Sequence, residues 1–135
     1  MLRRATTTTS IALMTLLAAG TASANPLGYA IDTSSDLYSI DFATGTATLI
    51  GPLIGNQAAL VEALAVSPSG QLFGTDSGGM LYSLNTNTGA ATLIGNTSLG
   101  NVEGLDFSGT TLVGTNYDFT TTFYSINTSS LRRRR

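Results

Sequence analysis

The chain contains no cysteine, no tryptophan, no histidine and no lysine among its 135 residues. Without cysteine it has no disulfides, the cross-links that many small exported domains use. The missing histidine, cysteine and lysine also exclude a Ser-His or Cys-His nucleophile, a lysine Schiff base and a zinc site of Cys and His ligands. These absences exclude much of the common catalytic machinery and predict a protein that is not an enzyme.

Positive charge is confined to the two ends of the sequence. The six basic residues are arginines, Arg3, Arg4 and residues 132–135, and all eight acidic residues lie between these two groups. Affinity for nucleic acid depends on basic side chains that contact phosphates. The acidic body therefore predicts no nucleic-acid partner and leaves an unknown protein or small molecule as the ligand.

The first 24 residues have the pattern of an export signal. Arg3 and Arg4 precede an apolar segment, IALMTLLAAG at 11–20, and small residues follow as ASA at 22–24. This order of charged, apolar and small residues is typical of a secretory signal peptide. The apolar run is too short to span a bilayer, which takes about 20 residues. We expect residues 1–24 to be a signal peptide, the mature chain to have no transmembrane segment, and the protein to be secreted or periplasmic.

The body of the chain repeats itself at a distance of 44 residues. Segment 37–51 reads LYSIDFATGTATLIG and segment 81–95 reads LYSLNTNTGAATLIG, with ten of fifteen positions identical. A shorter pair is VEALAV at 61–66 and VEGLDF at 102–107. Turn residues separate these short apolar runs, which favours strands joined by tight turns. If the strands of one unit are called a, b, c and d, the sequence predicts ten strands in the order b-c-d, a-b-c-d, a-b-c.

A period of 40 to 45 residues with four strands per unit is typical of a β-propeller blade. The strands lack a polar face: alternation places Leu81 on one face and Tyr82 and Leu84 on the other. A sheet with one face in water shows polar alternation, so we expect both faces to be covered. The prediction is an all-β fold in which residues 25–131 form about two and a half four-stranded antiparallel blades, a partial β-propeller, followed by a basic tail at 132–135.

The combination of VEGLDF with LYSLNTNTGAATLIG resembles the repeats of secreted bacterial β-propeller proteins of unknown function, some of which carry a PEP-CTERM sorting tail. In those repeats a Glu-Gly-Leu strand is followed by Leu-Tyr-x-Ile-Asp/Asn, a Thr-Gly turn and Thr-x-Ile-Gly. The similarity extends over about residues 27–127. The Pro-Glu-Pro motif and apolar helix of the sorting tail are missing before the arginines at 132–135. The resemblance implies a propeller fold and says little about activity.

A closed propeller usually has at least four blades, more than this sequence supplies. Three interpretations remain open. The chain is a fragment of a longer protein, or several copies assemble as a homo-oligomer that completes a ring, or the strands form a small open stack of sheets. An uncovered blade face would be an apolar patch of the kind that marks an interaction surface.

Glu62 and Glu103 occupy the second position of the two a strands. The a strand of a propeller blade lines the central channel, where two carboxylates would offer hard oxygen ligands to a divalent cation such as calcium. The alternative is that both side chains are simply solvated at the channel mouth. No other cofactor is predicted.

Other polar residues recur at strand ends and are expected to accept hydrogen bonds from backbone N–H groups of the adjoining turns. One set ends strand b and the other ends strand c: Asp32, Asp76 and Asn116, and Asp41, Asn85 and Asn127. A repeated tyrosine in strand c, at positions 38, 82 and 124, is expected to pack between blades.

Taken together, the residues favour an exported, non-enzymatic repeat module with a binding or structural role. The alternative is a fragment of a metal-dependent propeller hydrolase, lactonase-like in character, that uses the channel carboxylates.

Overall fold

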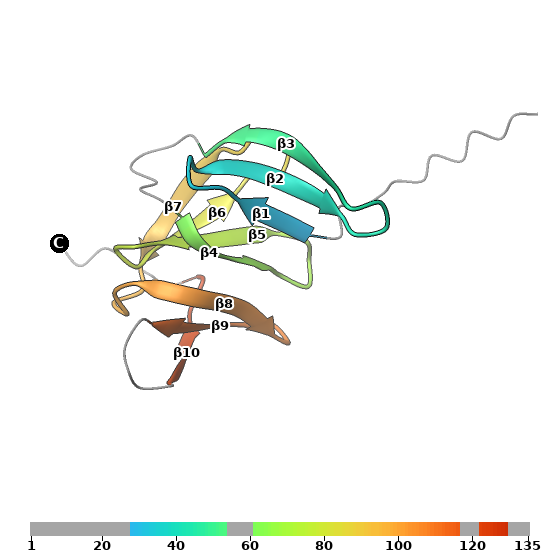
Figure 1. Ribbon diagram of the computed structural model, residues 1–135. Helices are drawn as coiled ribbons and strands as arrows, with labels where there is room; N and C mark the ends of the chain where they lie inside the picture. Colours follow the sequence, from blue (N-terminus) through green and yellow to red (C-terminus); the bar gives the residue numbers. More distant parts are fainter. Residues whose placement is uncertain (1–27, 54–60, 117–121, 130–135) are drawn as a thin grey trace, which may run out of the picture.

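The structure is a computed structural model that describes residues 28–53, 61–116 and 122–129 (Figure 1). The predicted signal peptide and basic tail lie outside the described residues. Within them the chain is all-β, with ten strands and no helix: β1 (Gly28–Ile31), β2 (Asp36–Asp41), β3 (Thr46–Pro52), β4 (Val61–Val66), β5 (Leu72–Asp76), β6 (Met80–Leu84), β7 (Ala91–Asn96), β8 (Val102–Ser108), β9 (Thr111–Asn116) and β10 (Phe123–Ile126).

The strands form three antiparallel sheets in which each strand pairs with the next one along the chain. The first sheet has the order β1-β2-β3, the second β4-β5-β6-β7 and the third β8-β9-β10. The predicted strand order is thereby confirmed, with three, four and three strands in successive sheets.

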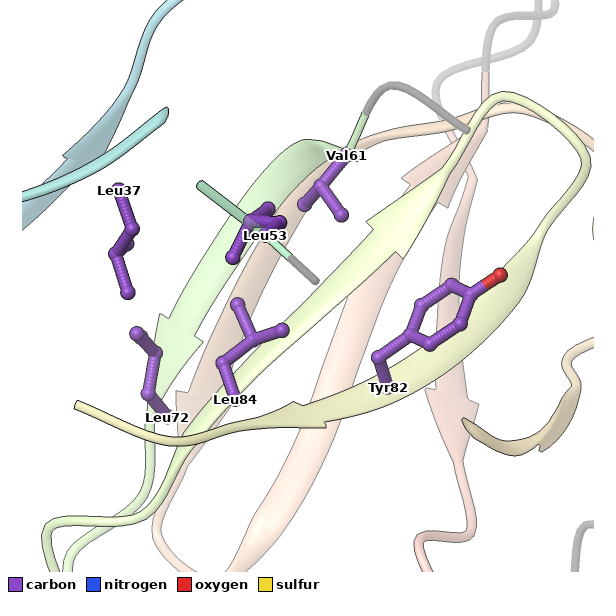
Figure 2. Packing of buried hydrophobic residues seen from close by; sticks show 6 residues of the cluster. All are labelled: Leu37, Leu53, Val61, Leu72, Tyr82 and Leu84. Atoms are coloured by element: carbon purple, nitrogen blue, oxygen red, sulfur yellow. The ribbon is translucent and has the colours of Figure 1, made fainter. Parts of the chain in front are cut away.

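The four-stranded sheet lies between the other two, with the first sheet above it and the third below it in Figure 1. One cluster of buried side chains fills the space between the first and second sheets, and Figure 2 shows six of its members: Leu37, Leu53, Val61, Leu72, Tyr82 and Leu84. A second cluster joins the second sheet to the third and contains Ala65, Leu81, Leu112 and Ile126. Leu81 thus faces one neighbour while Tyr82 and Leu84 face the other, as the alternation predicts.

The first strands of the second and third sheets, β4 and β8, lie side by side without being paired (Figure 1). A buried hydrogen bond also connects these two sheets: the Thr75 hydroxyl of β5 donates to the Val102 carbonyl of β8 at 3.3 Å. Because the Thr75 hydroxyl and the Val102 carbonyl are both buried, the bond gives each of them a partner that packing would otherwise deny.

The recurring Thr-Gly turn has a local physical cause. Oδ1 of Asp41 accepts the N–H of Ala43 at 2.8 Å, and Gly45 closes the turn by donating its N–H to the Asp41 carbonyl at 2.8 Å. Gly45 has a φ of 71°, a conformation that favours glycine over residues with a Cβ. The second sheet repeats the turn at Asn85 and Gly89, where φ is 74°. Asn127 likewise accepts the N–H of Ser129 at 2.9 Å, so the expected turn role of this set is confirmed.

A second recurring glycine is required by contact between strands. A Cβ on Gly74 would lie 2.7 Å from Cγ1 of Val61 and 3.1 Å from Cδ1 of Leu84. Gly114, at the same repeat position in β9, is crowded by Val102 and Ile126 in the same way. In the first sheet, for which no a strand is described, Ala30 occupies this position.

We expect Gly74→Ala to destabilise the fold by about 1–3 kcal/mol, the usual cost of overpacking a filled core. The free energy of unfolding, measured by urea denaturation, tests this. Because Val61 causes the closest clash, the cost should shrink when Gly74→Ala is introduced into a Val61→Ala background. An equal cost in both backgrounds would show that the clash with Val61 is not the reason for the glycine.

Candidate functional site

Glu62 and Glu103 are the extra residues of two equivalent β-bulges. The pairing of β4 with β5 passes from Val61 opposite Asp76 to Ala63 opposite Thr75, so that Glu62 stands opposite no residue. The pairing of β8 with β9 skips Glu103 in the same way. Both side chains are exposed. A bulge leaves one residue outside the ladder and re-aims its neighbours, which gives the repeated glutamate a structural context that its sequence position alone does not reveal.

The bulge in β4 also changes which side chains share a face. Val61 and Leu64 both contact the cluster toward the first sheet, although they are three residues apart, whereas Ala65 packs toward the third sheet. In a regular strand residues three apart lie on opposite faces. The extra residue therefore explains why Val61 and Leu64 lie on the same face of β4.

The two glutamates stand at matching bulges of strands that lie side by side. Glu103 Oε1 accepts a hydrogen bond from Nδ2 of Asn101 at 3.4 Å. Within the described part of the chain, no group of three or more His, Cys, Asp or Glu side chains could hold a metal ion. The calcium site at Glu62 and Glu103 stays a prediction.

A polar cluster that the sequence analysis missed is buried between the first and second sheets. Asp76 is only 3% exposed, and its Oδ1 accepts the N–H groups of Gly78 and Met80, both at 2.9 Å. Its Oδ2 accepts the Tyr82 hydroxyl at 2.8 Å. A buried carboxylate is costly unless it is hydrogen-bonded, and these three donors hold the turn between β5 and β6 against the tyrosine of β6.

The first sheet repeats this arrangement at its surface. Asp32 Oδ1 accepts the N–H groups of Ser34 and Asp36 at 2.8 and 3.0 Å, and Oδ2 accepts the Tyr38 hydroxyl at 3.2 Å. The backbone N–H of Asp36, followed by that of Ser34, holds the pKa of Asp32 below its usual value. The hydrogen bond to Asp32 in turn raises the pKa of Tyr38. The expected turn role of Asp32 and Asp76 is confirmed.

Tyr82 itself is 1% exposed and belongs to the cluster between the first two sheets, which confirms that this tyrosine packs between sheets. Burial raises its pKa to about 12, and the hydrogen bond to Asp76 adds to the effect. The spacing of six residues from Asp to Tyr, present in both sheets, was the signal in the sequence for this pair.

The third sheet departs from the motif. Its residue at the end of β9 is Asn116, and Tyr124 follows at a spacing of eight residues instead of six. Oδ1 of Asn116 is buried and has no hydrogen-bond partner among the residues that the structure describes. The expected turn role of Asn116 is thus not borne out by a hydrogen bond to this oxygen.

Two polar hollows occur at the same repeat positions of the second and third sheets. The first measures about 320 Å³ and the second about 410 Å³. Their linings share a hydroxyl- and amide-rich character: Gln71, Ser83, Asn85, Asn87 and Thr92 in one, and Thr110, Thr111, Ser125, Asn127 and Ser129 in the other. None of the described lining residues carries a charge, so these hollows offer hydrogen bonds but no general acid or base.

Among the described residues there is no helix of the length and apolarity that crossing a membrane requires. A comparison with known protein families finds no family model that matches the chain, and a comparison with curated proteins finds no match either.

Tyr82→Phe should destabilise the protein by about 1–3 kcal/mol, because it leaves the buried Oδ2 of Asp76 without its hydroxyl donor. Tyr38→Phe is the matched control at the exposed copy of the pair and should cost less than about 0.5 kcal/mol. Urea denaturation of the two variants measures both values. Equal costs at the two sites would contradict the assignment of Tyr82 to a buried, hydrogen-bonded role.

The same pair predicts a pH dependence at the alkaline end. The unfolded tyrosine loses its proton near pH 10, whereas folded Tyr82 keeps its proton up to about pH 12. The unfolded state therefore binds fewer protons in this range, and stability falls as the pH rises from about 10 to about 12. Tyr82→Phe should remove this part of the fall.

Proposed function

We propose that the chain is an exported, non-enzymatic β-propeller-type repeat module with a binding or structural role, in which each sheet is one blade. The observation that carries the proposal is the central sheet, which is covered on both faces by its neighbours in the chain. Blades of a propeller pack on one another around a channel. The placement of β4 beside β8 supports the same interpretation, since these are the strands that would line the channel.

Export is part of this proposal and rests on the first 24 residues, whose pattern is that of a secretory signal peptide. The resemblance of the repeats to secreted bacterial propeller proteins of unknown function agrees with it. The proposed site of action is the periplasm or the outside of the cell, with residues 25–131 as the repeat domain.

The non-enzymatic role is supported by the chemistry of the residues. The chain has no histidine, cysteine or lysine, and the two polar hollows are lined by uncharged side chains. Such linings suit recognition through hydrogen bonds to neutral groups rather than proton transfer. The ligand of the module is proposed only as a protein or small molecule.

A metal-dependent hydrolase fragment, lactonase-like in character, is the second candidate. One observation favours it: Glu62 and Glu103 are exposed carboxylates at equivalent bulges of neighbouring strands. In this alternative the two side chains would bind calcium in the channel of the complete propeller.

A calcium titration separates the two candidates. A site filled at 100 times its dissociation constant would stabilise the fold by about 2.7 kcal/mol, which raises the melting temperature by several degrees. The non-enzymatic module is expected to melt at the same temperature with millimolar calcium as with a chelator. It should also leave a chromogenic ester and a simple lactone unhydrolysed.

Glu62→Gln combined with Glu103→Gln is the control, because it removes both charges and keeps the side-chain volumes. A calcium-dependent rise in the wild-type melting temperature that disappears in this variant, together with hydrolysis of either substrate, would favour the hydrolase. A rise that persists in the variant would point to calcium binding elsewhere.

A further inference from the structure

Each sheet has a forward face, directed toward the next sheet in the chain, and a rear face, directed toward the preceding one. The residue that precedes the repeated tyrosine of strand c points from the forward face in all three sheets. Leu37 and Leu81 are both 0% exposed because the next sheet covers them, whereas Phe123, at the same position of the third sheet, is 72% exposed. Among the described residues, no further sheet covers the forward face of the third sheet.

This open forward face carries apolar residues at two of the positions that make the covered contact. It forms a groove of about 280 Å³ whose lining includes Val113, Thr115 and Phe123. The equivalent residues of the second sheet make the contact with the third sheet. Phe73 packs against Phe107 with ring centroids 5.6 Å apart, Thr75 donates its hydroxyl to the Val102 carbonyl, and Leu81 is a member of the buried cluster.

The rear face of the first sheet corresponds to the part of the opposite half that strands b, c and d supply, because no a strand is described in the first sheet. Leu49 is 55% exposed there, and Tyr38 lies beside it as its partner across β2 and β3. The equivalent residues of the second sheet, Leu93 and Tyr82, pack in the cluster beneath the first sheet. The two open faces therefore carry equivalents of residues that meet in the internal contacts, through strands b, c and d of the first sheet and strands b and c of the third.

We propose that a second copy of this chain covers the forward face of the third sheet with the rear face of its own first sheet, in a head-to-tail arrangement. The inference rests on the proposed function, in which the sheets are stacked as blades, and it names the partner of that module. Because the two faces differ, the contact is heterologous, and repeated contacts give a closed ring where the rotation closes.

Two positions of the repeat carry different residues on the two open faces. Ala65, which the third sheet buries, is replaced in the third sheet by Asp106, which is exposed. Ala65 belongs to β4, which lies beside β8. On the rear face of the first sheet, Phe42 lies over Gly28, at whose position the second sheet has the buried Leu72.

Light scattering coupled to size exclusion tests the proposal on the full chain. The wild type should run as a concentration-dependent species of two or more copies. Phe123→Asp disables the forward face and Leu49→Asp disables the rear face, so each variant alone should lose association by at least about tenfold. Ser69→Asp adds the same charge in the exposed turn between β4 and β5 and should associate like the wild type.

Mixing the two disabled variants gives the decisive readout. Phe123→Asp keeps an intact rear face and Leu49→Asp keeps an intact forward face, so an equimolar mixture should form a dimer and nothing larger. A wild type that stays monomeric over the accessible concentrations, or a mixture that stays monomeric while the wild type associates, would overturn the head-to-tail contact.

Melting curves recorded on the same samples distinguish a failure of the head-to-tail contact from a failure of the proposed stacked module. A monomeric wild type with one cooperative unfolding transition would reject the second copy and leave the stacked module intact. A wild type without a cooperative transition would reject the stacked module itself. A variant that loses its transition is replaced by Phe123→Ser or Leu49→Ser, for which the same masses are expected.

Discussion

The structure depends on covering a β-sheet that has no polar face. Leu81 on one side and Tyr82 and Leu84 on the other are all buried, so the second sheet requires an apolar neighbour on each face. The first and third sheets meet this requirement, and each of them in turn presents one covered and one open face. Burial of apolar side chains on both faces is the dominant favourable term in such a stack. Bulges and buried hydrogen bonds fit the strands to these two contacts.

The polar residues involved recur at equivalent positions of the sheets. The bulges at Glu62 and Glu103 shift the alternation within β4 and β8, and they leave both glutamate side chains exposed. The Asp76 carboxylate accepts hydrogen bonds from two backbone N–H groups and from the Tyr82 hydroxyl. These bonds allow a turn that contains an acidic residue to be buried against the first sheet. The uncovered copy of this pair, at Asp32 and Tyr38, shows that the turn forms without burial and that burial is what the neighbouring sheet adds.

The sequence was sufficient for the strand order and for the directions of Leu81 and Tyr82, because both follow from turn residues and from alternation within one strand. It was insufficient where two strands meet. The bulges arise from strand pairing, and no residue within VEALAV or VEGLDF indicates them. The need for glycine at position 74 comes from Val61 on another strand. The Asp76–Tyr82 bond was missed although its six-residue spacing recurs, since turn and packing roles were assigned to the two residues separately. Asn116 lacks the hydrogen bond expected at Oδ1, and the calcium site at Glu62 and Glu103 stays a prediction.

Native-state hydrogen exchange tests the central claim most directly. Strands β2, β5, β6 and β9 are each paired on both sides, so they differ mainly in how many faces of their sheet are covered. The account predicts that amides of β5 and β6 exchange only through global unfolding, with the free energy found by denaturation, while those of β2 and β9 exchange through openings of lower free energy. Protection of β5 and β6 that is no greater than that of β2 and β9 would contradict it.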